Sequence, residues 1–431
     1  MKHLLLATIA VFAGVMPAMA QEKSNKVTVD FQLRTRGEYR NGQGGLHSED
    51  VRPGTFINDR ARLGIAWENN GLSAKLSAQQ TGTWGNGAQQ TDSKKGLNVN
   101  EAWAKMKFGA DGAGFIQLGR QALSYDDQRL LGGLDWAVTG RSFDAVKVGF
   151  ENKTNALHAI FSYNQDSEHK AGETTSSGNH YSGVAGPQHM EALWYHINAA
   201  PSFGASLLFM NTGIQADKAD ADGNITEHRT NNMQTFGTYI NGKAKAFAYD
   251  FSAYYQMGKK TKDTNISAFM VSANAKYKIN EAFTVGVGDD YLSGSDGTGD
   301  KYKTFNNLYG THHKFYGTMD ILNTTPTQGL NDLNANVAYK ASKKVDMTLA
   351  YHYFAAPNAI KVADGDQKTL GSEVDLQLNW KIRQFVTLQA GYSVFFATQA
   401  MQNIKGGNKN CWQDWGWVSL NINPTVFTAI F

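Results

Sequence analysis

The sequence predicts an all-β protein, a transmembrane antiparallel β-barrel of about 18 strands whose connections alternate between short turns and long loops. Three observations lead to this fold class. The 431 residues are polar on the whole, with a mean hydropathy of −0.43. Several long segments alternate apolar and polar residues one by one. Finally, the connections between these segments are alternately very short and long, which is typical of barrels in the bacterial outer membrane.

Composition excludes several other classes of protein. A helical membrane span needs about 20 mostly apolar residues, and the only apolar stretch of any length lies at the N-terminus. A single cysteine, Cys411, excludes an internal disulfide framework and Cys-rich metal sites. The formal charge of +3 is spread along the chain, so we expect no nucleic-acid partner.

The first 20 residues are typical of a secretory signal peptide. Lys2 is followed by an apolar run from Leu4 to about Val15 and then by the small-residue pattern Ala18-Met19-Ala20. The alternative, an N-terminal membrane anchor, would need a longer apolar run. No linker divides the remaining sequence. We therefore expect a signal peptide at 1–20, cleaved near Ala20, and one outer-membrane barrel domain at 21–431.

Four segments carry the alternation most clearly. Apolar side chains occupy every second position in residues 27–33, 61–67, 72–78 and 269–279, with mostly polar side chains between them. The polar set of the first segment continues to Arg40, which makes an unusually long strand for a soluble sheet. One polar and one apolar face over about 9 to 11 residues is the pattern of a strand between lipid and an aqueous lumen.

The connections fall into two groups. Short turns, expected on the periplasmic side, are predicted at 68–71, 110–112, 241–243, 280–281, 341–343 and 382–383. Long extracellular loops are predicted at 41–55, 85–96, 122–140, 164–188, 215–228, 258–264, 294–329, 355–368 and 398–414. Because each long loop joins two strands, this second group sets the expected strand number.

Aromatic residues near the predicted strand ends indicate the girdles of a barrel. They are Trp67, Tyr239, Tyr255, Tyr277, Tyr291 and Trp380. The chain ends on Phe431, as outer-membrane barrels often do, and Pro424 predicts a bulge or a strand start nearby. A secreted propeller or solenoid is the alternative, but the sequence has no repeat of fixed length.

The polar faces of the first two strands place arginines in the lumen. A charge facing lipid near the midplane costs about 2 to 4 kcal/mol, so we expect the arginines of these strands to point inward. They are Arg34, Arg36, Arg60 and Arg62. An inward arginine can line a pore for anions, or it can pair with an acidic residue and serve only the structure.

Two later segments concentrate residues whose side chains can carry a charge. The first runs from Gly119 to Val146 and contains Arg120, Arg129, Arg141 and Asp144. The second runs from Gly288 to Gly317 and contains His312, His313 and Lys314. The first resembles the GRQ…Y…QRL.G…W…GR.FDA pattern, and the second the YLSG.D…LYGT.HKFYG pattern, of the alginate export porin family. The resemblance extends over nearly the whole chain after residue 20.

This resemblance implies a monomeric 18-stranded barrel whose arginine-lined lumen passively exports a uronate polysaccharide. It places the seven residues of the two segments at the pore, with Asp144 holding an arginine. Guanidinium groups match sugar carboxylates in shape and charge. Outer-membrane lipid and periplasmic export components are the other expected partners. The family's long late periplasmic loop has no counterpart here, because the turn at 381–384 is short, so a porin for small organic anions remains open.

Other functions find less support. Residues 220–225 resemble part of a calcium loop, but the first and last positions of that loop would be Lys218 and Arg229, where calcium needs carboxylates. Residues 293–300 are rich in Gly and Asp. His312 and His313 are adjacent, which would place them on opposite faces of a strand, so we expect no metal and no cofactor. No nucleotide-binding or hydrolase motif occurs, and we expect no enzyme. The remaining alternative is an adhesion barrel that binds through loops 164–188 and 294–329.

Overall fold

The computed structural model describes residues 24–86, 96–109, 111–165, 186–221, 225–227 and 229–431. The expected signal peptide at 1–20 lies outside these residues. So do most of the predicted loops 85–96 and 164–188 and part of the segment 220–225. Among the described residues, no helix is both long and apolar enough to cross a membrane.

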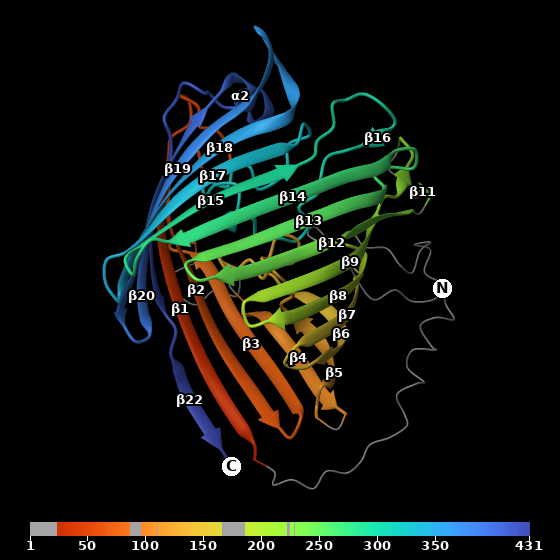
Figure 1. The fold of residues 1–431 in the computed structure, drawn as a ribbon, viewed down its shortest axis with the longest axis vertical. Coiled ribbons are helices and arrows are strands. Elements are labelled where there is room, and N and C mark those ends of the chain that lie inside the picture. The colour runs from red at the N-terminus through yellow and green to blue at the C-terminus, as the bar shows by residue number, and fades with distance from the viewer. Residues whose placement is uncertain (1–23, 87–95, 110, 166–185, 222–224, 228) are drawn as a thin grey trace.

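Long, tilted antiparallel strands curve round into a barrel (Figure 1). In chain order the elements are β1 (Lys26–Asn41), β2 (Gly54–Asn69), β3 (Leu72–Thr83), β4 (Asn98–Phe108), β5 (Gly114–Gln121), β6 (Phe143–Glu151), β7 (Asn155–Tyr163), β8 (His189–Ala200), β9 (Phe203–Gln215), β10 (Lys218–Ala219), β11 (Ile225–Glu227), β12 (Thr230–Ala244), β13 (Phe247–Lys259), β14 (Asn265–Lys278), β15 (Phe283–Leu292), β16 (Lys301–Tyr302), η2 (His312–Lys314), β17 (Leu330–Lys340), β18 (Val345–Val362), β19 (Gly365–Arg383), β20 (Val386–Ala397), α2 (Gln399–Lys405), β21 (Gln413–Ile422) and β22 (Thr425–Ile430).

The predicted barrel is confirmed, because the sheet closes into 18 antiparallel strands if β21 and β22 count as one strand and the two-residue β16, which pairs in parallel with β14, is left out. Each long strand pairs with the next long strand of the chain, as β9 does with β12 and β15 with β17, and β1 pairs with β21 and β22 to close the circle. The last two strands act as one interrupted strand, because β21 ends before Pro424 and the register of β1 shifts between Val29 and Asp30. The short β10 and β11 form a separate ribbon inside the connection from β9 to β12.

Three predicted connections are wrong in position, and one of them, the predicted turn at 382–383, is the end of β19, where Arg383 still pairs with Val386 of β20. The predicted loop 355–368 belongs to β18 and β19, which continue as a hairpin in which Ile360 pairs with Gln367. Its register shift surrounds Pro357, which has no N–H to give to the ladder. The predicted turn at 241–243 lies within β12, whose pairing with β13 continues to Ala244. The turn follows at Lys245, which adopts a left-handed backbone (φ 54°).

The outer face carries the apolar positions of the strands, including the expected aromatics Tyr255, Tyr277 and Trp380. Tyr239 is an exception to the predicted girdle. It pairs directly with the buried Ser206 and Ser252, so its side chain belongs to the inner face. The main hydrophobic core therefore lies inside the barrel, where inward strand residues pack against residues of the connecting loops.

Candidate functional site: a lumen with two inward loops

Two loops fold into the barrel and pack against its inner wall. In the β15–β17 loop (residues 293–329), Phe305, Met319 and Leu322 are buried in the main hydrophobic cluster with strand residues such as Phe354. In the β5–β6 loop (residues 122–142), Leu123 and Leu131 are buried in a second cluster. Burial of these side chains holds both loops inside the barrel.

The two loops also bind each other through their backbones. Leu131 and Tyr309 form a parallel β-bridge. The N–H of Gly132 donates to the carbonyl of Tyr309 (2.9 Å), and the N–H of Thr311 donates to the carbonyl of Gln128 (2.9 Å). The two segments that the sequence singled out therefore meet in the lumen, although more than 160 residues separate the bonded partners.

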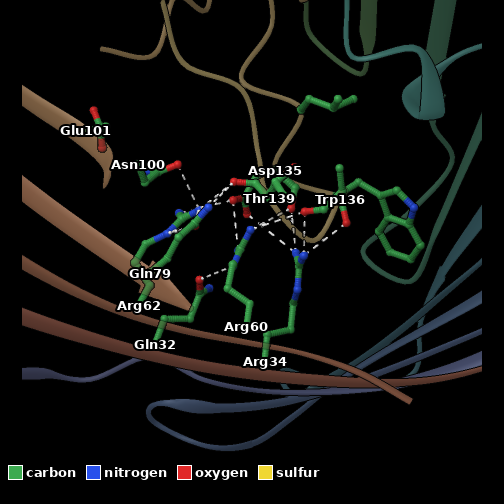
Figure 2. A network of polar contacts seen from close by, with 12 residues as sticks. Gln32, Arg34, Arg60, Arg62, Gln79, Asn100, Glu101, Asp135, Trp136 and Thr139 are labelled. Carbon is green, nitrogen blue, oxygen red and sulfur yellow. Dashed lines mark hydrogen bonds and ion pairs between the residues drawn. The ribbon is translucent and has the colours of Figure 1, made fainter. Parts of the chain in front are cut away.

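Four arginines form one side of this lumen, here called the basic wall. They are Arg34 and Arg36 on β1 and Arg60 and Arg62 on β2. Figure 2 shows three of them, with side chains pointing toward the tip of the β5–β6 loop. Alternation explains the shared face, because Arg34 pairs directly with Arg60, and Arg62 lies two positions further along β2.

Backbone carbonyls of the loop tip accept hydrogen bonds from the basic wall (Figure 2). Arg34 donates to the carbonyls of Asp135 (2.6 Å), Trp136 (3.2 Å) and Ala137 (2.8 Å). Arg62 donates weakly to the carbonyl of Thr139 (3.5 Å). Carbonyl oxygens carry only partial negative charge, so they orient the guanidinium groups without neutralising them.

One carboxylate serves three of these arginines. Asp135 Oδ1 lies 3.0 Å from Arg60 Nη2 and 3.6 Å from Arg62 Nη1, and Asp135 Oδ2 lies 4.0 Å from Arg34 Nη1. The side chain of Asp135 is 68% exposed, whereas Arg60 is fully buried beneath it. Arg34 and Arg62 keep 11% and 19% of their side-chain surface exposed. This part of the lumen is therefore positively charged and open to water at its edge.

Arg36 donates to the carbonyl of Trp136 (3.0 Å) and also contacts the ring of that residue. Its Nε donates to Glu38 Oε1 (2.8 Å), and its guanidinium carbon lies 4.2 Å from the centre of the Trp136 ring. The ring of His313, from the other loop, stacks on the same indole with a centroid distance of 4.2 Å. His313 Nδ1 lies 2.9 Å from Asp320 Oδ1. Trp136 thus joins the basic wall to both inward loops.

Three other basic residues predicted at the pore, Arg141, His312 and Lys314, contact backbone carbonyls of the two inward loops. Arg141 Nη1 donates to the carbonyls of Tyr309 and Gly310, and Lys314 Nζ donates to the carbonyl of Asp127 (3.0 Å). His312 Nε2 lies 3.1 Å from the carbonyl oxygen of Asn307. Burial lowers the pKa of Arg141, of His312 and of Lys314. Arg141 and Lys314 therefore connect the two loops, whereas His312 binds within its own loop.

Arg129 does not face the open lumen as predicted. It is only 3% exposed, and its guanidinium lies 2.7 Å from Asp127 Oδ2 and 2.8 Å from Asp290 Oδ2. Burial alone would lower the pKa of Arg129, but Asp290 and the other nearby groups outweigh burial and raise it. Because the Nε and Nη1 groups of Arg129 are already paired with buried carboxylates, Arg129 has a structural role.

Arg120 and Asp144 differ from the prediction too, because they lie on the outer face. Arg120 pairs directly with Asp144, and the pair two positions away, Leu118 with Val146, is 52% and 39% exposed toward the outside. Arg120 Nη1 donates to Asp144 Oδ2 (2.9 Å). Asp144 thus contacts an arginine, but the two residues are not part of the lumen. The segment from Gly119 to Val146 begins in β5 and ends in β6. The alternation of side chains along these two strands places Arg120 and Asp144 on the outer face.

The sequence reasoning missed the acidic part of the lumen. Asp290 on β15, Asp332 on β17 and both Glu373 and Asp375 on β19 point inward and are buried. We call these four residues the acidic wall. The same alternation that identified the arginines would have found them. Among the described residues, no three His, Cys, Asp or Glu side chains are arranged to hold a metal ion.

The closed barrel with two inward loops defines the class of protein: a channel of the bacterial outer membrane. The model of the alginate export family matches residues 25–411, and the chain therefore belongs to this family. A search of curated proteins finds no match.

Solved structures with the same fold are outer-membrane proteins. OccAB1 of Acinetobacter baumannii is 12% identical, with a TM-score of 0.64 over 93% of this chain and 97% of that one. The outer membrane protein OpdK of Pseudomonas aeruginosa is 10% identical, with a TM-score of 0.60 over 94% and 99%. A structure of OpdK with vanillate is 9% identical, with a TM-score of 0.58 over 93% and 99%.

Proposed function

We propose that this chain is a passive channel whose arginine-rich lumen passes acidic saccharides, with uronate polymers of the alginate type as the main substrate class. One observation carries the proposal: Arg34, Arg60 and Arg62 share the single carboxylate of Asp135. An excess of positive charge on the inside of a lumen with low-dielectric walls attracts anions. The family match supports the polysaccharide.

The chemistry of the basic wall suits a carboxylate on a moving chain. A guanidinium group offers a planar fork of donors that matches a carboxylate in two parallel hydrogen bonds. Arg34 and Arg62 present partly exposed edges beside the loop tip. A uronate can contact these edges and pass to the next cation without breaking a strong, fully buried ion pair. Repeated exchange of this kind allows an anionic polymer to slide.

A porin for small organic anions is the second candidate. Two inward loops occupy part of the lumen, and a neighbour with the same fold was solved with vanillate, a small aromatic carboxylate. In either case we propose a monomer with a single barrel domain after removal of residues 1–20. For the polymer exporter we also propose periplasmic partners that deliver the chain.

Reversal potentials of the refolded protein in a planar bilayer, under a potassium chloride gradient, test the proposal. We expect anion selectivity and block by oligouronates. Arg60→Ala plus Arg62→Ala should reduce both. Arg120→Ala is the matched control, because it removes an arginine from the outer face and should leave selectivity unchanged.

Oligouronates of increasing length separate the two candidates. Block that strengthens with length supports a polymer path, whereas equal block by monomers and by small carboxylates supports the porin for small anions. Cation selectivity that the double substitution does not change would overturn both candidates. An absence of conductance would favour the adhesion barrel.

A further inference from the structure

The acidic wall is the largest set of charged luminal groups for which the proposed function has no use. Asp290 and Asp332 pair directly across β15 and β17, and Glu373 and Asp375 lie two positions apart on β19. The four residues are at most 2% exposed. By contrast, the exposed edge of the lumen belongs to Asp135, Arg34 and Arg62. A passing ion therefore meets the basic wall and not the acidic wall.

Residues 317–322 of the β15–β17 loop cover two of these carboxylates directly. The N–H of Met319 donates to Glu373 Oε1 (2.8 Å), and the hydroxyl of Thr318 donates to Asp375 Oδ1. Gly317 has a positive φ of 79°, and a side chain there would collide with the carboxylate of Glu373. Only this close approach lets the loop backbone reach the acids.

Apolar side chains complete the cover. Met319, Ile321 and Leu322 are at most 1% exposed and belong to the same cluster as Phe354 on the inner wall. They place hydrocarbon between the carboxylates and the water of the lumen. The loop therefore supplies donors to the acids on one side and separates them from the passage on the other.

Few cations balance these acids. Arg129 pairs with Asp290 but also with Asp127. His352 lies between two acids, with Nδ1 2.8 Å from Asp332 Oδ1 and Nε2 3.7 Å from Asp375 Oδ2. Glu373 has no cationic partner among the described residues. In contact with water, carboxyl groups of this kind ionise near pH 4, so an uncovered wall would be negative at neutral pH.

We propose that residues 317–322 act as an electrostatic cover: by burying Glu373 and Asp375 they remove the acidic wall from the ion path and make the channel selective for anions. Selectivity then depends on two elements, the arginines that attract anions and the loop that hides the acids. The inference rests on the proposed function, because it explains how the same lumen achieves its selectivity.

The test compares reversal potentials of four refolded full-length proteins in a potassium chloride gradient. They are the wild type, a variant with residues 317–322 replaced by a short Gly-Ser linker, the pair Glu373→Gln plus Asp375→Asn, and the linker variant carrying that pair. In the linker variant the anion-to-cation permeability ratio should fall by about threefold or more, the effect of one unit charge about 6 Å from an ion in water. Adding the pair to the linker variant should restore the ratio, and the pair alone should change nothing.

If the linker variant does not refold, a milder variant, Thr318→Gly plus Met319→Gly, is tested instead. It removes the hydroxyl donor and one apolar cover and should shift the ratio in the same direction. An anion-selective wild type with an unchanged ratio in the opened variants would overturn this inference and leave the proposed function intact. A wild type that is not anion-selective would overturn the proposed function itself, and the cover with it.

Discussion

The basic wall and the acidic wall lie in the same lumen, but a different inward loop contacts each of them, with different polar groups. The β5–β6 loop offers carbonyl oxygens to Arg34 and leaves an exposed edge. The β15–β17 loop offers an N–H and a hydroxyl to Glu373 and Asp375 and leaves almost no exposed surface. The first loop thus supplies hydrogen-bond acceptors to the arginines, and the second supplies hydrogen-bond donors to the carboxyl groups. The comparison teaches that the packing of the inward loops, and not the number of charged residues on a wall, decides which charges stay exposed.

The largest expected effect concerns the one arginine among the acids. Arg129→Ala leaves Asp127 and Asp290 buried without their cation. Removing one partner of a buried ion pair costs about 3 to 5 kcal/mol of folding free energy. Urea unfolding in detergent micelles measures this loss. Adding Asp290→Asn should recover part of it, and a cost below about 1 kcal/mol would contradict the structural role of Arg129.

The next effect concerns the anchor of the basic wall. Trp136→Ala removes the ring between Arg36 and His313. We expect a loss of about 2 kcal/mol and larger fluctuations of the open-channel current, because the loop tip loses its stacking contacts. Trp136→Phe is the control and should retain most of the stacking. Equal current noise in wild type and Trp136→Ala would show that the tip is held by its carbonyl bonds alone.

A smaller effect follows from the single carboxylate of the basic wall. Asp135→Asn removes one exposed negative charge beside Arg60 and Arg62. The anion-to-cation permeability ratio should rise by about threefold. Asp144→Asn removes a carboxylate from the outer face and should leave the ratio unchanged. A ratio that falls in Asp135→Asn would mean that Asp135 orients the arginines more than it offsets their charge.

The smallest effect concerns pH. Burial lowers the pKa of His312 below its ordinary value of 6.5, so the folded chain favours the neutral imidazole. Its contribution to stability is complete above about pH 6.5 and is lost as the pH falls through the lowered pKa of the folded state. The free energy of unfolding should therefore fall more on acidification for the wild type than for His312→Gln. Parallel pH curves would contradict this role of His312.

Much of the fold could be predicted from the sequence, because period-two alternation is a local property. The barrel and the inward side of Arg34, Arg36, Arg60 and Arg62 follow from it, and the nine long loops between the strands give the strand number. The hairpin of β18 and β19 could not be predicted, because its polar tip looks like a loop while its backbone pairing continues. Alternation applied to β5 and β6 would also have placed Arg120 and Asp144 outside.

The sequence by itself determined which side chains face the lumen, since a strand sends successive residues to opposite faces. Only the tertiary structure decided which of these side chains meet water. Arg34 binds a loop 101 residues away, and Arg129 binds Asp290 at a separation of 161 residues. Contacts at such separations depend on closure of the barrel and on how each loop packs inside it. Local periodicity carries no information about either, so burial and pairing of the charges appear only in the folded chain.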